Sequence, residues 1–150
     1  MNFAIHWYID GSHQIHEDCR GRTGSLVTFG AGAVSSSSDK QKSNTKSSTE
    51  TEIIALHDKL SDVIWMRYFV ECQGYTIDEC IIFQDDMSAL SLEKNGRISS
   101  SKRTKHIKAK YFLIKDFNDA GEVDLRYCPT GEMWADVLTK PLQGQLFRDM

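Results

Sequence analysis

Residues 3–9, FAIHWYI, run directly into Asp10-Gly11, and the fold can be worked out from this stretch. Aromatic and β-branched side chains dominate it, which predicts a buried strand, and the Asp-Gly pair predicts that the strand ends there. Residues 23–29, bounded by glycines, predict a second strand, and a weaker third begins near Ala33. Residues 35–49 contain no large apolar side chain, so we expect a polar loop there, with at most the frayed end of an edge strand.

The remainder of the chain alternates helical and strand patterns. An amphipathic segment from about Ser48 to Gln73 predicts a long helix whose N-cap is Ser48 or Thr49. Its inward stripe passes through Leu56, Leu60 and Val63. Further strands are predicted at 80–83 and 122–128, and further helices at 88–92, 104–117 and 130–140.

This order of elements predicts one α/β domain that spans residues 1–150. Three consecutive strands favour an antiparallel meander, and later strands separated by helices favour crossovers that add parallel strands. We therefore expect a mixed five-stranded sheet, its first three strands antiparallel and its later strands parallel to the first, flanked by helices. A length of 150 residues with 40% hydrophobic and 26% charged residues is that of a folded domain and excludes wholesale disorder.

The sequence also bears on where the protein resides. No apolar run approaches the ~20 residues of a membrane helix, and residues 1–20 lack the basic-then-apolar layout of a secretion signal. The cysteines form no CxxC pair, so we expect reduced, buried thiols in an intracellular protein and no structural zinc site. These cysteines are Cys19, Cys72, Cys80 and Cys128.

The charge is unevenly distributed along the chain. The net charge is −3, yet residues 94–115 contain eight Lys or Arg and no acid, a local charge of +8 that leaves −11 for the rest. Such segregation suits a protein that holds a polyanion on one side and cations in an acidic site on another. A solvated, charged helix face explains the composition equally well.

Two aspartates end neighbouring predicted strands. Asp10 ends the first strand and Asp85 ends the fourth, so both project from the same carboxyl edge if the strands are parallel neighbours. Asp136 lies on the last predicted helix, with Glu132 one turn earlier as its rival.

A third acid is expected from the first turn of the long helix. Glu50 and Glu52 are two residues apart, so only one of them faces the sheet. Glu52 precedes Leu56 by one turn on the inward stripe, whereas Glu50 shares its stripe with His57, and we therefore choose Glu52. Clustered carboxylates need cations, and Mg²⁺ prefers hard oxygen ligands. Turn formation and helix-dipole pairing explain any one of these acids alone.

Six motifs in order resemble one known family. The chain is similar over about residues 5–148 to the RNase H domain that closes the Pol polyprotein of copia-type LTR retrotransposons. The motifs are YIDGS at 8–12, RTGS at 22–25, KSSTETEIIAL at 46–56, IIFQDDMSAL at 81–90, RTKHI at 103–107 and YCPTGEMWADVLTKPL at 127–142.

This resemblance implies an RNase H-like fold and endonucleolytic cleavage of the RNA strand of an RNA–DNA hybrid. It implies two Mg²⁺ ions, with Mn²⁺ as a substitute, on the four acids Asp10, Glu52, Asp85 and Asp136. It also implies a reverse transcriptase domain normally in cis, no membrane partner and no small-molecule cofactor. The family suggests the cytoplasm, within virus-like particles, with the nucleus as the alternative.

The basic segment supplies the candidates for nucleic-acid contact. Lys102, Arg103 and Lys105 are expected to meet the backbone of the hybrid. His106 is expected to contact phosphate or, alternatively, to form a hydrogen bond at a helix start.

Two departures from the family pattern favour other hypotheses. Serines occupy positions 35–38, where the family commonly has apolar residues, which predicts a short or poorly anchored third strand. Asp86 follows the catalytic Asp85 where the family usually has Asn, and it adds negative charge. The alternative function is therefore a decayed or isolated retroelement fragment that binds nucleic acid without catalysis. An integrase-type transferase is disfavoured by the acids on the first and last helices.

Overall fold

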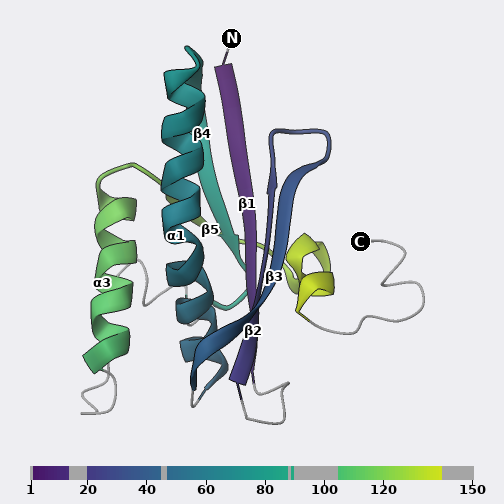
Figure 1. The fold of residues 1–150 in the computed structure, drawn as a ribbon, viewed down its shortest axis with the longest axis vertical. Helices are drawn as coiled ribbons and strands as arrows, with labels where there is room; N and C mark the ends of the chain where they lie inside the picture. The colour runs from purple at the N-terminus through teal and green to yellow at the C-terminus, as the bar shows by residue number, and fades with distance from the viewer. Residues whose placement is uncertain (1, 14–19, 45–46, 88, 90–104, 140–150) are drawn as a thin grey trace.

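A computed structural model describes residues 2–13, 20–44, 47–87, 89 and 105–139 (Figure 1). Its strands are β1 (Asn2–Ser12), β2 (Arg20–Thr28), β3 (Ala33–Asn44), β4 (Thr76–Gln84) and β5 (Asp124–Tyr127). The helices are α1 (Ser48–Cys72) and α3 (Lys105–Asp119), followed by two short 3₁₀ helices, η2 (Thr130–Glu132) and η3 (Trp134–Leu138). None of the described helices is both long and apolar enough to cross a membrane.

The five strands form one mixed sheet in the order β3-β2-β1-β4-β5. β1 pairs antiparallel with β2 and β2 antiparallel with β3, while β1–β4 and β4–β5 are parallel. This confirms the expected fold class. In the β1–β4 register Tyr8 lies opposite Phe83, so Asp10 and Asp85 each follow an aligned pair by two residues.

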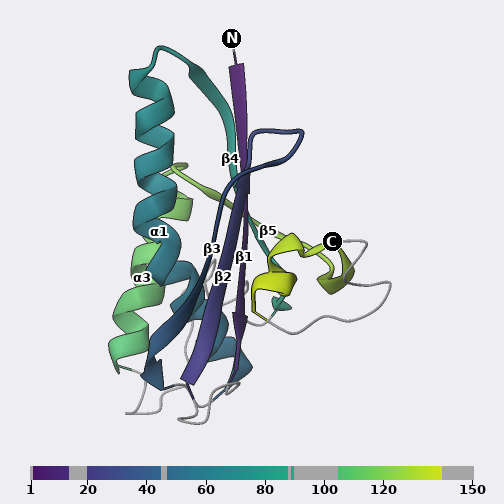
Figure 2. The ribbon, with the colours of Figure 1, turned by 45° about the vertical axis from the view of Figure 1, so that its right-hand side comes forward.

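The core lies between the sheet and α1. Both ribbon views show α1 and α3 on one face of the sheet and the 3₁₀ helices on the other (Figures 1 and 2). Ile5 and Ile9 of β1 and Leu56 of α1 are fully buried, which confirms the predicted inward stripe. The helix begins at Ser48 as predicted, but its N-cap is Ser47 rather than Ser48 or Thr49, because the Ser47 side chain accepts a hydrogen bond from the Glu50 N–H at 3.2 Å.

The predicted polar loop at 35–49 is wrong for residues 35–44, which belong to β3. An edge strand needs backbone pairing on one side alone, and polar side chains are favoured there. Ser37 and Ser25 also join their hydroxyls across the pair at 2.8 Å. The serine run therefore builds a paired edge strand of full length, and the expectation of a short third strand is wrong.

The predicted last helix is also wrong in form. η2 and η3 are separate 3₁₀ turns, because Met133 between them adopts an extended backbone with φ −78° and ψ 94°. Met133 and Ala135 are buried against Tyr8 and Phe83, and this packing favours two short turns over one continuous helix. The predicted helix at 88–92 lies almost wholly outside the described residues. Of the cysteines that are described, Cys80 and Cys128 are buried as expected, but Cys72 is exposed.

Candidate active site

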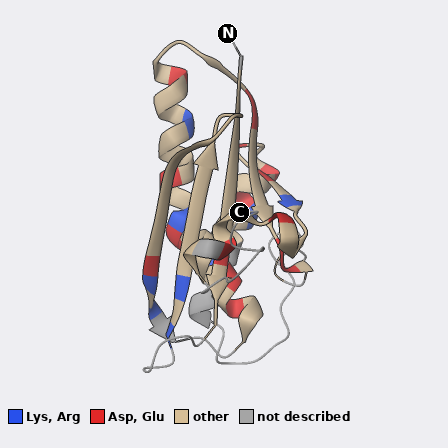
Figure 3. Ribbon diagram, turned by 90° about the vertical axis from the view of Figure 1, so that its right-hand side faces the viewer, with Lys and Arg blue, Asp and Glu red and all other residues tan. Residues whose placement is uncertain are grey.

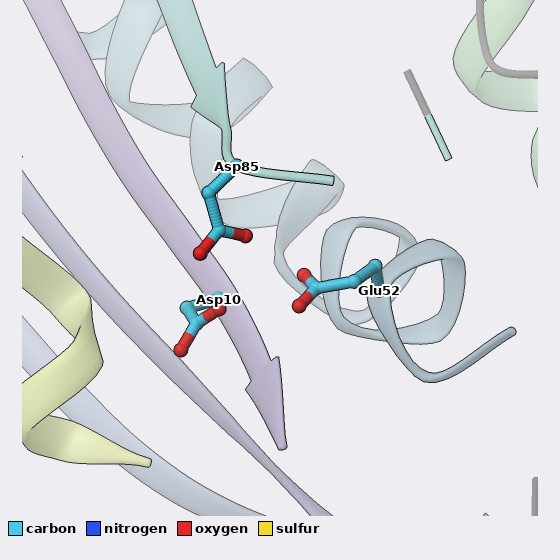
Figure 4. A group of neighbouring side chains, drawn as sticks. All are labelled: Asp10, Glu52 and Asp85. Carbon is cyan, nitrogen blue, oxygen red and sulfur yellow. The ribbon is translucent and has the colours of Figure 1, made fainter. Parts of the chain in front are cut away.

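Three acids from three elements meet at one edge of the sheet. Asp10 of β1, Glu52 of α1 and Asp85, which follows β4, each place a carboxylate oxygen within 4.8 Å of the other two. The three side chains point toward one another (Figure 4). Asp10 and Glu52 are buried and Asp85 is partly exposed, so the group opens to solvent on the Asp85 side. We call these three residues the acid cluster.

The structure places Glu52 in the acid cluster. Its Oε2 accepts a hydrogen bond from the backbone N–H of Gly11 at 3.0 Å, which ties the first turn of α1 to the end of β1. This close approach requires a glycine, since a Cβ on Gly11 would lie 2.9 Å from the Thr51 carbonyl oxygen. The choice of Glu52 over Glu50 from helical periodicity therefore agrees with the structure.

The electrostatics of the acid cluster favour a cation. Burial raises the pKa of Glu52 well above its usual range, and the charges of Asp10 and Asp85 raise it further. A proton on Glu52 relieves this repulsion, and a divalent cation relieves it more fully by attracting all three carboxylates. The donor set consists of carboxylate oxygens, which are the ligands that Mg²⁺ and Mn²⁺ prefer. The residues present therefore fit the predicted metal.

The raised pKa of Glu52 predicts how stability depends on pH without metal. In EDTA, the free energy of unfolding should fall as pH rises from the usual pKa of glutamate through the raised one. The reason is that the folded protein holds a proton that the unfolded chain releases. Urea unfolding at a series of pH values measures this slope. In saturating Mg²⁺ the free energy of unfolding should instead rise with pH. The Glu52→Gln protein in EDTA should show no such fall. Equal slopes for the wild type and Glu52→Gln in EDTA would contradict the assignment of the fall to Glu52.

Asp136 lies beside the acid cluster rather than within it. It is 4% exposed on η3, and its carboxylate is not among the three that lie within 4.8 Å of one another. Its rival Glu132 is exposed. The same turn reaches the acid cluster through Thr139, whose hydroxyl donates to Asp10 Oδ2 at 2.6 Å. Burial thus favours Asp136 over Glu132, and its role as a fourth metal ligand stays a prediction.

Asp86 has a structural function that sequence reasoning missed. Its Oδ1 accepts a hydrogen bond from the Ala89 N–H at 3.0 Å, as a capping aspartate does.

The buried Gln84 side chain accepts from the N–H groups of Asp85 and Asp86 at 3.0 and 3.3 Å. Gln84 therefore fixes the backbone that carries Asp85. The sequence signal for this function of Gln84 is its place, as a polar residue, at the end of the apolar strand 80–83.

The predicted nucleic-acid contacts cannot be placed. Lys102 and Arg103 lie outside the described residues, and Lys105 and His106 are described only as the first residues of α3. The structure shows a different basic site, a groove between β3, α1 and α3. We call it the lysine groove, after the four lysines that line it: Lys40, Lys42, Lys59 and Lys110.

The lysine groove retains a positive balance. Asp39 and Asp58 also line it, and Lys59 pairs with Asp39 at 2.8 Å. Four lysines against these two aspartates leave the groove with a positive balance. Figure 3 shows basic residues gathered near one end of the outer strands. Sequence reasoning missed Lys40 and Lys42 because it assigned them to a loop.

Comparisons with known proteins relate the chain to larger proteins. No family model matches it. A retrovirus-related Pol polyprotein from transposon TNT 1-94 of Nicotiana tabacum is 36% identical over 125 residues, which are 83% of this chain and 9% of that protein. Two Pol polyproteins from Arabidopsis thaliana transposons are each 30% identical. The chain spans about a tenth of the length of these relatives.

Solved structures share its fold at low sequence identity. LC11-RNase H1 in complex with an RNA/DNA hybrid superposes with a TM-score of 0.65 at 18% identity, covering 90% of this chain and 93% of that one. The prototype foamy virus protease-reverse transcriptase gives 0.59 at 15% identity, covering 91% and 20%. The chain is therefore related to the retrovirus-related Pol polyproteins of plant transposons and has the ribonuclease H fold.

Proposed function

We propose that this chain is the RNase H domain of a copia-type Pol protein. In this proposal it cleaves the RNA strand of RNA–DNA hybrids endonucleolytically during retrotransposon reverse transcription. The observation that carries it is the acid cluster, in which β1, α1 and the end of β4 bring three carboxylates within 4.8 Å of one another. Support comes from the Pol relatives and from the fold shared with LC11-RNase H1, which was solved with a hybrid.

The acid cluster is proposed to hold the metal. Asp10, Glu52 and Asp85 would bind Mg²⁺, or Mn²⁺ in its place, with Asp136 as the fourth ligand of a two-ion site. Ions held by these residues would supply the Lewis acidity that activates a water and stabilises a leaving 3′ oxygen. The chain itself orients the carboxylates: the Gly11 N–H holds Glu52 and the Gln84 side chain holds the Asp85 backbone.

The lysine groove is proposed to receive phosphates of the hybrid, together with the predicted contacts at Lys102, Arg103, Lys105 and His106. Lys40 and Lys42 are both exposed on β3, and their charges attract a polyanion without reading its sequence. The reverse transcriptase domain is the proposed partner in cis; in the foamy virus enzyme the similar fold occupies a fifth of a longer chain. We place this assembly in the cytoplasm.

Neutralising the lysine groove should weaken binding of the hybrid. The double substitution Lys40→Gln with Lys42→Gln should lower the slope of log K against log salt by about 2, because each phosphate contact releases counterions. Fluorescence anisotropy with a labelled hybrid in EDTA measures this. Lys115→Gln with Arg126→Gln removes the same charge from side chains that pair with Asp119 and Asp124. Equal losses in the two double variants would argue against a specific groove.

A cleavage assay separates the proposed enzyme from the non-catalytic alternative. The RNA strand of a hybrid is end-labelled and incubated with the protein at low salt in Mg²⁺ or Mn²⁺, beside single-stranded RNA and duplex DNA. We expect internal cuts in the RNA of the hybrid alone, lost in EDTA. If the hybrid binds but remains intact with both metals, the chain is a nucleic-acid-binding fragment.

A further inference from the structure

The turn that follows Asp136 contacts the acid cluster through one side chain. Thr139 is 2% exposed, and its hydroxyl lies 2.6 Å from Oδ2 of Asp10, a residue 129 positions away in sequence. The same hydroxyl lies 3.1 Å from the Asp136 carbonyl oxygen, which also accepts the Thr139 backbone N–H. A hydroxyl has one proton, and 2.6 Å is typical of an O–H group that donates to a carboxylate. The proton therefore goes to Asp10.

The turn itself is fixed to the sheet at several points. The Trp134 ring stacks on Tyr8 of β1, with centroids 4.9 Å apart and planes 19° apart. The carbonyl oxygen of Leu138 accepts a hydrogen bond from the Ser38 hydroxyl of β3. On β2, Gly24 permits the close approach, since a Cβ there would lie 2.8 Å from Thr139 Cγ2. Three strands thus determine where the Thr139 hydroxyl lies. Figure 2 shows the 3₁₀ helices, which end just before Thr139, on the face of the sheet opposite α1.

The hydrogen bond has a consequence for the direction of the Asp10 carboxylate. The two oxygens of a carboxylate are rigidly linked, so a donor that fixes Oδ2 also fixes the direction of Oδ1. Asp10 is fully buried beside two further carboxylates, whose repulsion favours turning it away. The buried Thr139 hydroxyl, which is bound to Asp10 Oδ2, opposes that rotation.

We propose that Thr139 is a positioning residue for the metal site: its hydroxyl orients the Asp10 carboxylate toward Glu52 and Asp85. Because Thr139 follows Asp136 in the same turn, one segment holds Asp10 and carries the predicted fourth acid. This inference rests on the proposed function, since it deepens the assignment of the acid cluster as a metal site. The proposed role explains why a threonine rather than an apolar residue is buried at position 139.

The test compares three substitutions at Thr139. Thr139→Val keeps the shape and removes the hydroxyl, Thr139→Ala removes both branches, and Thr139→Ser keeps the hydroxyl. Mn²⁺ affinity is measured by titration calorimetry, well below the melting temperature of each protein, beside kcat and KM for the hybrid. We expect the Val and Ala proteins to bind Mn²⁺ about 10- to 100-fold more weakly, with a lower kcat and an unchanged KM. The Ser protein should stay within about threefold of the wild type.

Three results would overturn the inference. If the Val or Ala protein binds Mn²⁺ as tightly as the wild type, the hydroxyl does not position the metal site. A Ser protein as weak as the Ala protein assigns the effect to the lost methyl group. If Val and Ala both fail to fold while Ser folds, Thr139 is a structural residue. The proposed function fails separately, if the wild type binds Mn²⁺ but leaves the hybrid intact.

Discussion

Glu52→Gln is expected to reduce hybrid cleavage by a factor on the order of 10³ or more, while Glu50→Gln leaves it nearly unchanged. Glu52 is buried in the acid cluster and accepts the Gly11 N–H, whereas Glu50 is not part of the cluster. Glutamine keeps the size of the side chain and one carbonyl oxygen, but it removes the negative charge that attracts the cation. The loss therefore reports on charge rather than on packing.

Initial cleavage rates in Mg²⁺ measure this difference between two residues of the same helical turn. The Glu52→Gln protein should also be more stable than the wild type in EDTA at neutral pH. Folding of the wild type must either bind a proton at Glu52 or accept its repulsion by Asp10 and Asp85, whereas the amide is neutral without a proton. A stable but inactive protein would separate the function of Glu52 from the fold. Cleavage by Glu52→Gln within about tenfold of the wild type would contradict the assignment.

Gly21→Ala is expected to destabilise the protein by about 1–3 kcal/mol or more. Gly21 is buried on β2, and an added Cβ would lie 2.3 Å from the Ser12 carbonyl oxygen and 3.0 Å from Gln41 Oε1. The first of these atoms is backbone, so relief requires β1 and β2 to move apart. Gln41 donates to the Thr51 carbonyl oxygen beneath the first turn of α1, so the disturbance extends toward the active site.

Urea unfolding of Gly21→Ala beside Gly32→Ala measures the cost of the contact. Gly32 is exposed, with no described atom within 4 Å of an added Cβ, and it reports the effect of the alanine itself. A loss of a few kcal/mol corresponds to a melting temperature several degrees lower in a protein of this size. Equal stability of the two variants would mean that β1 and β2 are spaced more widely than the structure shows.

The acid cluster was predictable because it depends on local rules. The strand of Asp10 continues two residues past the predicted end, to Ser12, and Asp85 directly follows β4. Both residues still lie near the carboxyl ends of parallel neighbours, which meet at one edge of the sheet. Glu52 follows from the 3.6-residue period of α1, in which it shares a face with Leu56. Strand ends and helix faces are properties of short segments, and the sequence specifies them directly.

The remaining parts of the site depend on contacts between distant segments. β3 has no apolar alternation, and its backbone pairing with β2 and the polar side-chain contacts across that pair produce no pattern that the sequence alone displays. The hydrogen bond from Thr139 to Asp10 spans 129 residues and requires η3 to pack on three strands first. Lys40 and Lys42 belong to the lysine groove only because β3 exists. Tertiary packing, rather than local propensity, determines these features.

The central claim is that Asp10, Glu52 and Asp85 form a divalent-metal site. Anomalous X-ray diffraction from crystals grown in Mn²⁺ tests it most directly, with the wild type and Asp85→Asn examined side by side. The account predicts an anomalous peak in the wild type within bonding distance of the oxygens of all three acids, weakened or lost in Asp85→Asn. A wild-type crystal in saturating Mn²⁺ with no peak there, or a peak that Asp85→Asn leaves unchanged, would contradict it.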